Sequence, residues 1–292
     1  MNASAGSVHA AIRELEDHAQ GRVVVFGATS LDIDLLPALY ETLGGIGHGE
    51  RLDVVVFCRG GSVNAARRIA LLFREFAGRL RFIVPHFCES AGTIMALAAD
   101  EIVAGPLAIF SPTDPHLSAD GGSGPSALSA QDVRLFPQMS RDWFGIDEKT
   151  AQERALPQLC ESIFPTTLTS FYRCTREVQV ISNELLALHL PDHAAQRRQA
   201  IADALLFDFH SHTFALTRDD LARIGLPVSR DPAIERIAWA IAREVRARIG
   251  AESRGSADAD WYDAILITRD EGIRRRRSVD APAAVWEALA AR

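Results

Sequence analysis

The stretch LDVVVFCRGGS, residues 52–62, decides the fold of this chain. Apart from Asp53, its first seven residues are apolar, which is typical of a strand buried on both faces of a parallel sheet. Gly60 and Gly61 follow directly after Arg59. Two glycines permit a tight turn in which a backbone amide approaches a ligand without a Cβ in the way. The stretch therefore predicts a buried strand that ends in a turn with free backbone donors.

The segments around this stretch alternate between strand and helix. Strands are predicted at residues 22–28, 80–85, 101–104 and 107–110, and helices at residues 31–43, 63–76 and 94–99. Because the links between them are short, the alternation favours an α/β fold with a parallel sheet covered by helices. The second half of the chain is mainly helical, with helices predicted at residues 165–190, 194–209 and 232–249.

We expect three parts along the chain. An N-terminal helical arm covers residues 1–21, and a main α/β domain covers residues 22–230. A C-terminal part, residues 231–292, holds a helix, an Arg-rich hairpin at 262–279 and a terminal helix at 282–291. Residues 112–129 are rich in Gly, Ser, Asp and Pro, which predicts a mobile loop.

Composition excludes several classes of protein. The chain has 292 residues, of which 48% are hydrophobic and 24% charged, the balance of a folded protein. Its formal net charge is −7, which argues against nucleic acid as a partner. The run of four arginines at 274–277 is therefore interpreted as a solvated edge strand. Lys149 is the one lysine, so a mechanism that needs a lysine amine has one candidate.

The sequence also predicts the compartment and the absence of a cofactor. No apolar run has the length of a signal peptide or a membrane span, so we expect a cytoplasmic protein without stable membrane insertion. The four cysteines are scattered, with no CxxC and no clustered Cys/His set, so no metal site is expected. No phosphate-binding loop is present in the sequence, and no cofactor is expected.

A second motif, ESAG at residues 89–92, fits acyl-transfer chemistry. It places Ser90 at the start of a predicted helix, where backbone N–H groups are free. Since the carboxyl ends of neighbouring parallel strands meet at one edge, this motif and the glycine turn are expected to lie together. Ser90 is then the candidate nucleophile. The N–H groups of Gly60, Gly61 and Ala91 are the candidate oxyanion hole.

These motifs carry a resemblance to a known family. RGGSV at 59–63, ESAG at 89–92, ADEIV at 99–103 and PTDP at 112–115 resemble the Clp-protease/crotonase superfamily. The likeness is strongest to signal peptide peptidase A and the serine dehydrogenase proteinase family. SHTF at 211–214 and GLPV at 225–228 resemble later segments of that family.

The resemblance implies a fold and a nucleophile. It implies a Clp/crotonase-like parallel sheet core of β/α units, with a helical second half and a small C-terminal α+β appendage. It implies a chain that forms homo-oligomers, with Ser90 as the nucleophile and a backbone oxyanion hole.

The general base stays open among three residues. Signal peptide peptidases use a lysine, and Lys149 follows Ser90 by 59 residues, although it lies in a charged stretch typical of surface. Clp-type proteases use a histidine about 25 residues after the serine, and His116 follows by 26, where the family usually has Gln. His212 matches a histidine of the family, and a structural role is its alternative. Asp114 is interpreted as a residue that fixes loop geometry.

The function that the sequence favours is a serine hydrolase. We expect a cytoplasmic, ATP-independent peptidase that acts on peptide or protein substrates through a Ser90 acyl-enzyme. Two alternatives stay open: a catalytically inactive scaffold of the same fold, and a crotonase-like acyl-CoA enzyme. A serine in the ESAG context favours the hydrolase over the crotonase, which needs no serine there.

Overall fold

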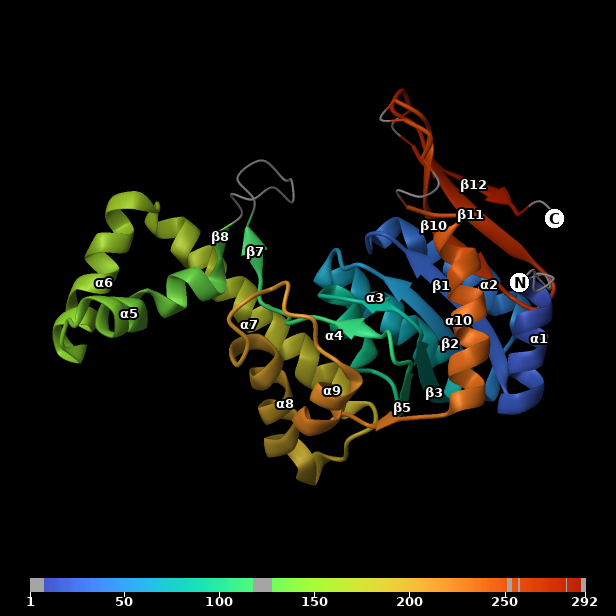
Figure 1. The fold of residues 1–292 in the computed structure, drawn as a ribbon, viewed down its shortest axis with the longest axis horizontal. Helices are drawn as coiled ribbons and strands as arrows, with labels where there is room; N and C mark the ends of the chain where they lie inside the picture. The colour runs from blue at the N-terminus through green and yellow to red at the C-terminus, as the bar shows by residue number, and fades with distance from the viewer. Residues whose placement is uncertain (1–7, 118–127, 251–253, 257, 282, 290–292) are drawn as a thin grey trace.

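The computed structural model describes residues 8–117, 128–250, 254–256, 258–281 and 283–289, and its centre is a single large sheet (Figure 1). The strand order along the sheet is β12-β11-β10-β1-β2-β3-β5-β9. Five of these strands run parallel: β1 (Arg22–Ala28), β2 (Gly49–Cys58), β3 (Ala77–Val84), β5 (Glu101–Ala104) and β9 (Val228–Ser229). The parallel sheet predicted from the alternating segments is confirmed.

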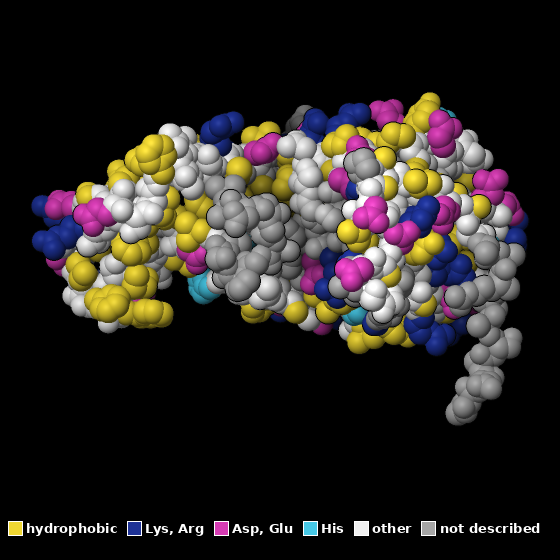
Figure 2. Space-filling view, turned by 90° about the horizontal axis from the view of Figure 1, so that it is seen from above, with side chains coloured by type: hydrophobic (Ala, Val, Ile, Leu, Met, Phe, Trp, Pro, Cys, Tyr) yellow, Lys and Arg dark blue, Asp and Glu magenta, His cyan; other side chains and the backbone are white. Residues whose placement is uncertain are grey.

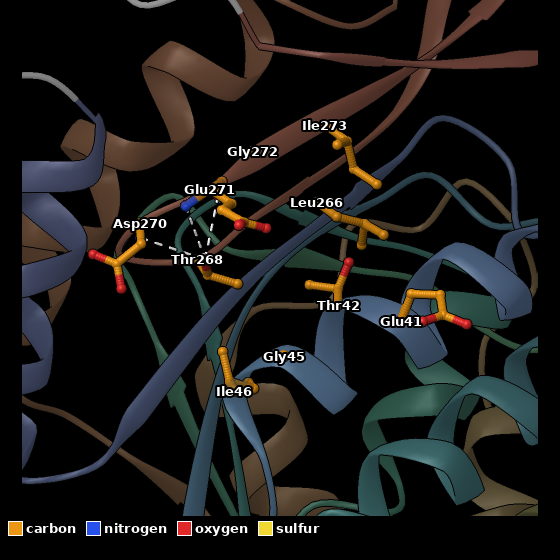
Figure 3. Close-up of a pocket in the computed structure, with 10 residues that line it drawn as sticks. All are labelled: Glu41, Thr42, Gly45, Ile46, Leu266, Thr268, Asp270, Glu271, Gly272 and Ile273. Atoms are coloured by element: carbon orange, nitrogen blue, oxygen red, sulfur yellow. Dashed lines mark hydrogen bonds between the residues drawn. The ribbon is translucent and has the colours of Figure 1, made fainter.

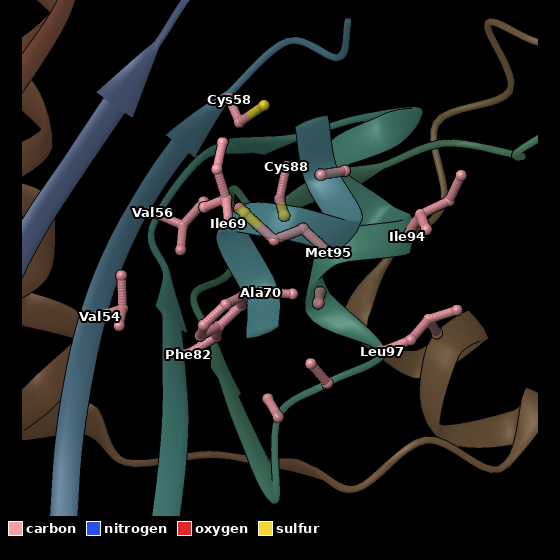
Figure 4. Packing of buried hydrophobic residues seen from close by; sticks show 14 of the residues in the cluster. Val54, Val56, Cys58, Ile69, Ala70, Phe82, Cys88, Ile94, Met95 and Leu97 are labelled. Carbon is pink, nitrogen blue, oxygen red and sulfur yellow. The ribbon is translucent and has the colours of Figure 1, made fainter. Parts of the chain in front are cut away.

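Helices cover both faces of the sheet, so the strands are apolar on both sides. One face carries α2 (Leu36–Ile46), α3 (Val63–Glu75), α4 (Ala91–Ala96), α7 (Pro165–Ala187) and α8 (Ala195–Phe207). The other carries α1 (Val8–Ala19) and α10 (Pro232–Arg246). Figure 4 shows Val54, Val56 and Phe82 of the sheet beneath residues of α3 and α4. The helix that opens with the ESAG motif, α4, is thereby held against α3, α7 and β4.

Two short strands branch off the sheet next to the glycine turn. In β4 (Phe87–Cys88), Cys88 pairs with Cys58 at the end of β2, and β4 pairs in turn with β6 (Ile109–Phe110). This branch carries the chain around the end of the sheet. It thereby sets the turn after β2 beside the turn after β4.

A helical arm projects from this side of the molecule. It consists of α5 (Ala130–Phe144) and α6 (Glu148–Ser162), and Figure 1 shows it extending away from the sheet beyond α7. A small ribbon of β7 (His116–Leu117) and β8 (Leu128–Ser129) joins it to the core. Later in the chain, α9 (Arg218–Ile224) packs beside α8.

The C-terminal segment continues the central sheet. Strands β10 (Trp261–Ile267) and β11 (Gly272–Arg277) form the predicted hairpin, and β10 pairs antiparallel with β1. The predicted terminal helix is wrong, because residues Val285–Ala288 form a strand, β12, that pairs with β11. Pairing with β11 outweighs the helical propensity of this short segment. In the strand Trp286 packs over Arg275, whereas Glu287 binds Arg276.

The arginine run is also not a solvated edge. Because β12 covers β11, Arg275 is 1% exposed and pairs with Asp32 and Asp263. Arg277, two residues on, binds the same two carboxylates from the same face. A buried guanidinium survives because both ends of its fork are satisfied. The arginine run is therefore a structural part of the sheet. The prediction that nucleic acid is not a partner then depends on the net charge alone.

Parts of four predicted segments lie outside the described residues: residues 1–7 of the N-terminal helical arm, 118–127 of the Gly-rich loop, 251–253 and 257 of the stretch before β10, and 282 and 290–291 of the predicted terminal helix. The helices of the described chain include none with the length and apolar character needed to cross a membrane.

Gly61 gives the first testable prediction. Its φ is +126°, and a Cβ there would lie 2.3 Å from the backbone N of Leu31. We therefore expect Gly61→Ala to lower the free energy of unfolding by about 3 kcal/mol, because strain and clash fall on backbone that cannot move aside. Gly44→Ala, on the exposed side of α2 with open space around it, is the control and should be neutral or slightly stabilising. Equal melting temperatures for the two variants would contradict this account of the turn.

Candidate active site

Ser90 has a strained backbone at the sharp turn between β4 and α4. Its φ is +53° and its ψ is −116°, which non-glycine residues rarely adopt. Buried hydroxyls hold this turn: Ser90 N–H donates to Ser111 Oγ at 2.7 Å, and Ser111 N–H donates to Thr93 Oγ1 at 3.2 Å. Thr93 Oγ1 donates in turn to Cys88 O at 2.9 Å. Strain held in place by its surroundings is a feature of functional sites.

The glycine turn lies directly against this serine. A Cβ built on Gly60 would be 3.1 Å from Ser90 Cβ and 3.5 Å from Ser90 Oγ. Gly60 N–H points to Cys58 Sγ at 3.3 Å, a weak acceptor. Within the described chain, neither Gly61 N–H nor Ala91 N–H has a hydrogen-bond acceptor. The structure thus brings together all four residues that the sequence assigned to nucleophile and oxyanion hole.

Asp114 and His212 meet beside this turn because two distant segments pair. Phe110 and Leu216 form an antiparallel bridge. Asp114 lies four residues after Phe110 and His212 four residues before Leu216, so antiparallel register sets them opposite each other. His212 Nδ1 is 2.9 Å from Asp114 Oδ1. The contact identifies Nδ1 as the protonated nitrogen and leaves Nε2 free as a base.

His116 reaches the other oxygen of the same carboxylate. Its Nε2 is 3.1 Å from Asp114 Oδ2, and its ring meets the His212 ring edge-on with centroids 4.2 Å apart. Two of the three predicted base candidates are therefore neighbours. Ser90 Oγ makes no hydrogen bond to either histidine in the described part of the chain.

Charge at this cluster follows from burial and from the imidazoles. Burial alone would raise the pKa of the Asp114 carboxyl, but hydrogen bonds from His116 and His212 outweigh it and lower the pKa to about 2. Glu89, next to Ser90, has its pKa raised by burial, against the opposing charges of Arg59 and His212. The site therefore keeps Asp114 ionised at neutral pH, as a residue that orients an imidazole must be.

Lys149 lies elsewhere. It is in the first turn of α6 on the projecting arm, its side chain is 83% exposed, and its Nζ is 3.8 Å from Glu153 Oε1. A lysine that serves as a base needs desolvation to lose its proton near neutral pH. Within this chain Lys149 has the solvated surface environment that its charged sequence neighbours indicate.

Two cysteines adjoin the site but are not nucleophiles. Cys58 Sγ and Cys88 Sγ lie under the turn, where a Cβ on Gly92 would be 3.1 Å from Cys58 Sγ (Figure 4). Burial raises the pKa of Cys58 to about 12 and that of Cys88 well above its usual value. Because the thiolate is the reactive form, both thiols are inert structural groups.

Alkylation checks this assignment. At pH 8 a thiol with a pKa of about 12 is ionised in roughly one molecule in 10⁴. We expect iodoacetamide to modify the partly exposed Cys160 and Cys174 in the native protein and all four cysteines after denaturation. Mass spectrometry of tryptic peptides reads out both cases. Fast native modification of Cys58 or Cys88 would contradict the buried environment.

An apolar cavity of about 410 Å³ borders the Asp114 side of the cluster. Its lining is mainly apolar and aromatic, with arginines among it: Leu168, Phe171, Tyr172, Leu206, Phe207, Arg134 and Arg176 are included. Arg134 stacks on the Phe207 ring at 3.9 Å. A second cavity of about 270 Å³, drawn in Figure 3, lies between α2 and the β10–β11 hairpin and does not include Ser90 or its neighbours.

Sequence reasoning undervalued Asp114, which the structure places at the centre of the cluster. The absence of a metal stays a prediction from the sequence, although Asp114, His116 and His212 converge in the fold with 98 residues between the first and the last. The available signal was the pairing of PTDP with SHTF, two motifs of one family resemblance that the chain brings together.

Comparisons with known proteins agree with this picture over part of the chain. Residues 41–134 match the model of a family described as ClpP-like SDH-type serine proteinase. This segment is about a third of the chain, contains Gly60, Ser90 and Asp114, and confirms the resemblance to the serine dehydrogenase proteinase family there. His212 lies outside the matched segment.

Curated relatives and solved structures add names but little functional information. Two uncharacterized proteins of Methanocaldococcus jannaschii are 41% and 36% identical over 66 residues, which is 23% of this chain and 23% of each relative. A mutant of the 1510-N membrane-bound stomatin-specific protease is 16% identical with a TM-score of 0.41, covering 72% of this chain and 78% of that one. An enoyl-CoA hydratase from Polaromonas sp. JS666 is 16% identical with a TM-score of 0.34, covering 77% and 78%.

Proposed function

We propose that this protein is a serine peptidase in which Ser90 is the nucleophile and His212, oriented by Asp114, is the general base. The observation that carries the proposal is the strained turn at Ser90, which sets its Oγ against the glycine turn and leaves two backbone N–H groups without acceptors. The family match over residues 41–134 supports the same chemistry.

The reaction follows from the roles of these groups. His212 Nε2 takes the proton of Ser90 Oγ as the oxygen attacks the carbonyl carbon of a peptide bond. The N–H groups of Gly61 and Ala91 stabilise the oxyanion, and Gly60 N–H joins them if it leaves Cys58 Sγ. His212 then gives the proton to the leaving amine, and an acyl-enzyme forms on Ser90. Water, deprotonated by the same histidine, releases the acid product and restores Ser90.

The missing hydrogen bond between Ser90 and His212 sets a requirement on this mechanism. Catalytic contacts in a free enzyme are often long and tighten when substrate binds. His212 lies on a partly exposed segment, so its ring has room to turn. The proposal requires that His212 Nε2 comes within hydrogen-bond distance of Ser90 Oγ when substrate binds.

The apolar cavity supports a substrate preference. Its lining includes Asp114, the carboxylate that orients the proposed base, and we propose that a side chain next to the cleaved bond enters it. We propose that the enzyme, without a nucleotide, prefers peptides with a large apolar side chain at this position, because burial of such a chain contributes about 1.5–3 kcal/mol.

Digestion of a defined peptide library tests the function. Mass spectrometry of the products should show cuts beside Leu, Phe or Met with the native protein and no cuts with Ser90→Ala. A library left intact by the folded native chain, or one cut equally by Ser90→Ala, would contradict the peptidase.

We propose that the working form is a homo-oligomer built through the projecting arm. Large apolar side chains are exposed on the arm and at the adjoining start of α7. On the arm these are Trp143, Phe144 and Leu156, and next to it Phe164 and Tyr172; each is at least 64% exposed. Figure 2 shows hydrophobic side chains gathered over this end of the molecule. Exposed apolar surface of this extent marks an interaction site. Light scattering should show more than one chain per particle for the native protein and fewer for Trp143→Glu, and a strict monomer would contradict it.

A further inference from the structure

One carboxylate between two imidazoles is more than a catalytic dyad requires. Asp114 Oδ1 is held by His212 Nδ1 at 2.9 Å, and Asp114 Oδ2 by His116 Nε2 at 3.1 Å. A general base needs one orienting carboxylate oxygen and one histidine. His116 and the second oxygen of Asp114 are therefore left without a role in the proposed reaction.

The three groups have the chemistry of a zinc site. Imidazole nitrogen and carboxylate oxygen are ordinary zinc ligands, with bonds of about 2.0–2.2 Å. Tetrahedral ligands at such bond lengths lie about 3.4 Å from one another. One ligand atom from each of Asp114, His116 and His212 lies within 4.8 Å of the other two, and the carboxylate contacts are already near 3 Å.

The three side chains of the cluster differ in solvent exposure, and the two imidazoles are accessible to an ion from solvent. The Asp114 side chain is 4% exposed, whereas those of His116 and His212 are 29% and 28% exposed. The anionic ligand is fixed on the protein side, and the two imidazoles face partly outward. An ion from solvent can therefore reach all three and keep one coordination position for water.

We propose that Asp114, His116 and His212 bind one Zn²⁺ ion, with an open fourth position, and that the bound ion switches the hydrolase off. The proposal that zinc binds depends only on the geometry of the cluster, whereas the proposal that zinc inhibits rests on the proposed function.

The reason for inhibition is the tautomer of His212. In the free enzyme, Nδ1 carries the proton toward Asp114 and Nε2 is the base. When Nδ1 donates its electron pair to zinc, the neutral ring must carry its proton on Nε2. That nitrogen then cannot accept the proton of Ser90, so zinc and catalysis exclude each other. No proton is gained or lost in this change; it moves from one ring nitrogen to the other.

Isothermal titration calorimetry with ZnCl₂ on the full chain tests the site. We expect one ion per chain, and at least a tenfold weaker affinity in His116→Gln, which removes one of three ligands from a partly exposed position. His210→Gln, an exposed imidazole two residues from His212, is the matched control and should bind as the native chain does. Ser90→Ala should also keep the native affinity.

Thermal melting with and without ZnCl₂ gives a second readout, because an ion that binds the folded state raises the melting temperature. Circular dichroism establishes that each variant is folded. Equal zinc affinity in His116→Gln and His210→Gln, or no binding by a folded native chain, would overturn the site.

Inhibition is tested separately. Zn²⁺ should slow modification of Ser90 by a fluorophosphonate in the native chain, with a midpoint that shifts at least tenfold higher in His116→Gln. If zinc binds by calorimetry but Ser90 is never modified even without zinc, the proposed function fails and the site stands. If Ser90 is modified at the same rate with zinc bound, the switch is wrong.

Discussion

Ser90→Gly is expected to abolish hydrolysis and, in the same protein, to raise the free energy of unfolding by about 1 kcal/mol. Activity falls because the nucleophile is gone, and removal of a catalytic serine costs on the order of 10³-fold or more. Stability rises because glycine adopts a φ of +53° without the strain that Ser90 carries there.

Two control variants separate these effects. Ser90→Ala removes the hydroxyl but keeps the strain, so it should lose activity without the gain in stability. Gln20 is the other described non-glycine residue with a positive φ, at +52°. Gln20→Gly replaces a positive-φ side chain outside the candidate site and should leave activity unchanged. Chemical unfolding and peptide hydrolysis, measured on the same samples, check all three variants. Residual hydrolysis by Ser90→Gly near the native rate would remove Ser90 from the mechanism.

His212→Ala is expected to lower kcat/KM by roughly 10⁴-fold, the scale seen when a catalytic histidine or its orientation is lost. Lys149→Met should change it less than about twofold, because the Lys149 side chain is 83% exposed on the arm. Asp114→Asn should resemble His212→Ala in direction, since an amide cannot hold the imidazole in the same tautomer.

The opposite effects of the Lys149 and His212 variants would identify a lysine as the base. If Lys149→Met silences the enzyme and His212→Ala does not, a lysine supplied by a neighbouring chain is the base. His116→Gln distinguishes the two histidines: a larger loss there than in His212→Ala would assign the base to His116.

Local pattern predicted most of the core. The strands predicted at 22–28 and 101–104 have the bounds that the structure shows, because each is a β-branched apolar run with a glycine next to one end, Gly21 or Gly105. The terminal helix failed because residues 285–288 are short, and pairing with β11 outweighs their helical propensity. The prediction of a solvated arginine run is wrong for a related reason. Arg275 is buried against Asp32, which lies 243 residues away, and no local sequence pattern indicates such a contact.

The site divides in the same way. Ser90 and the glycine turn could be predicted because strand ends in a parallel sheet meet at one edge. Asp114 and His212 meet because Phe110 and Leu216 form one antiparallel bridge. No periodic pattern in the sequence predicts this bridge. The sequence therefore leaves the three candidate bases open, and the proposal of His212 rests on the fold.

Covalent labelling of the folded protein by a fluorophosphonate tests the central claim most directly. The account predicts one adduct per chain, mapped by mass spectrometry to Ser90, absent in Ser90→Ala and greatly slowed in His212→Ala. An adduct on another residue would contradict the assignment of the nucleophile. No adduct on a native chain that circular dichroism shows to be folded would contradict the hydrolase and favour a protein that uses this fold as a scaffold.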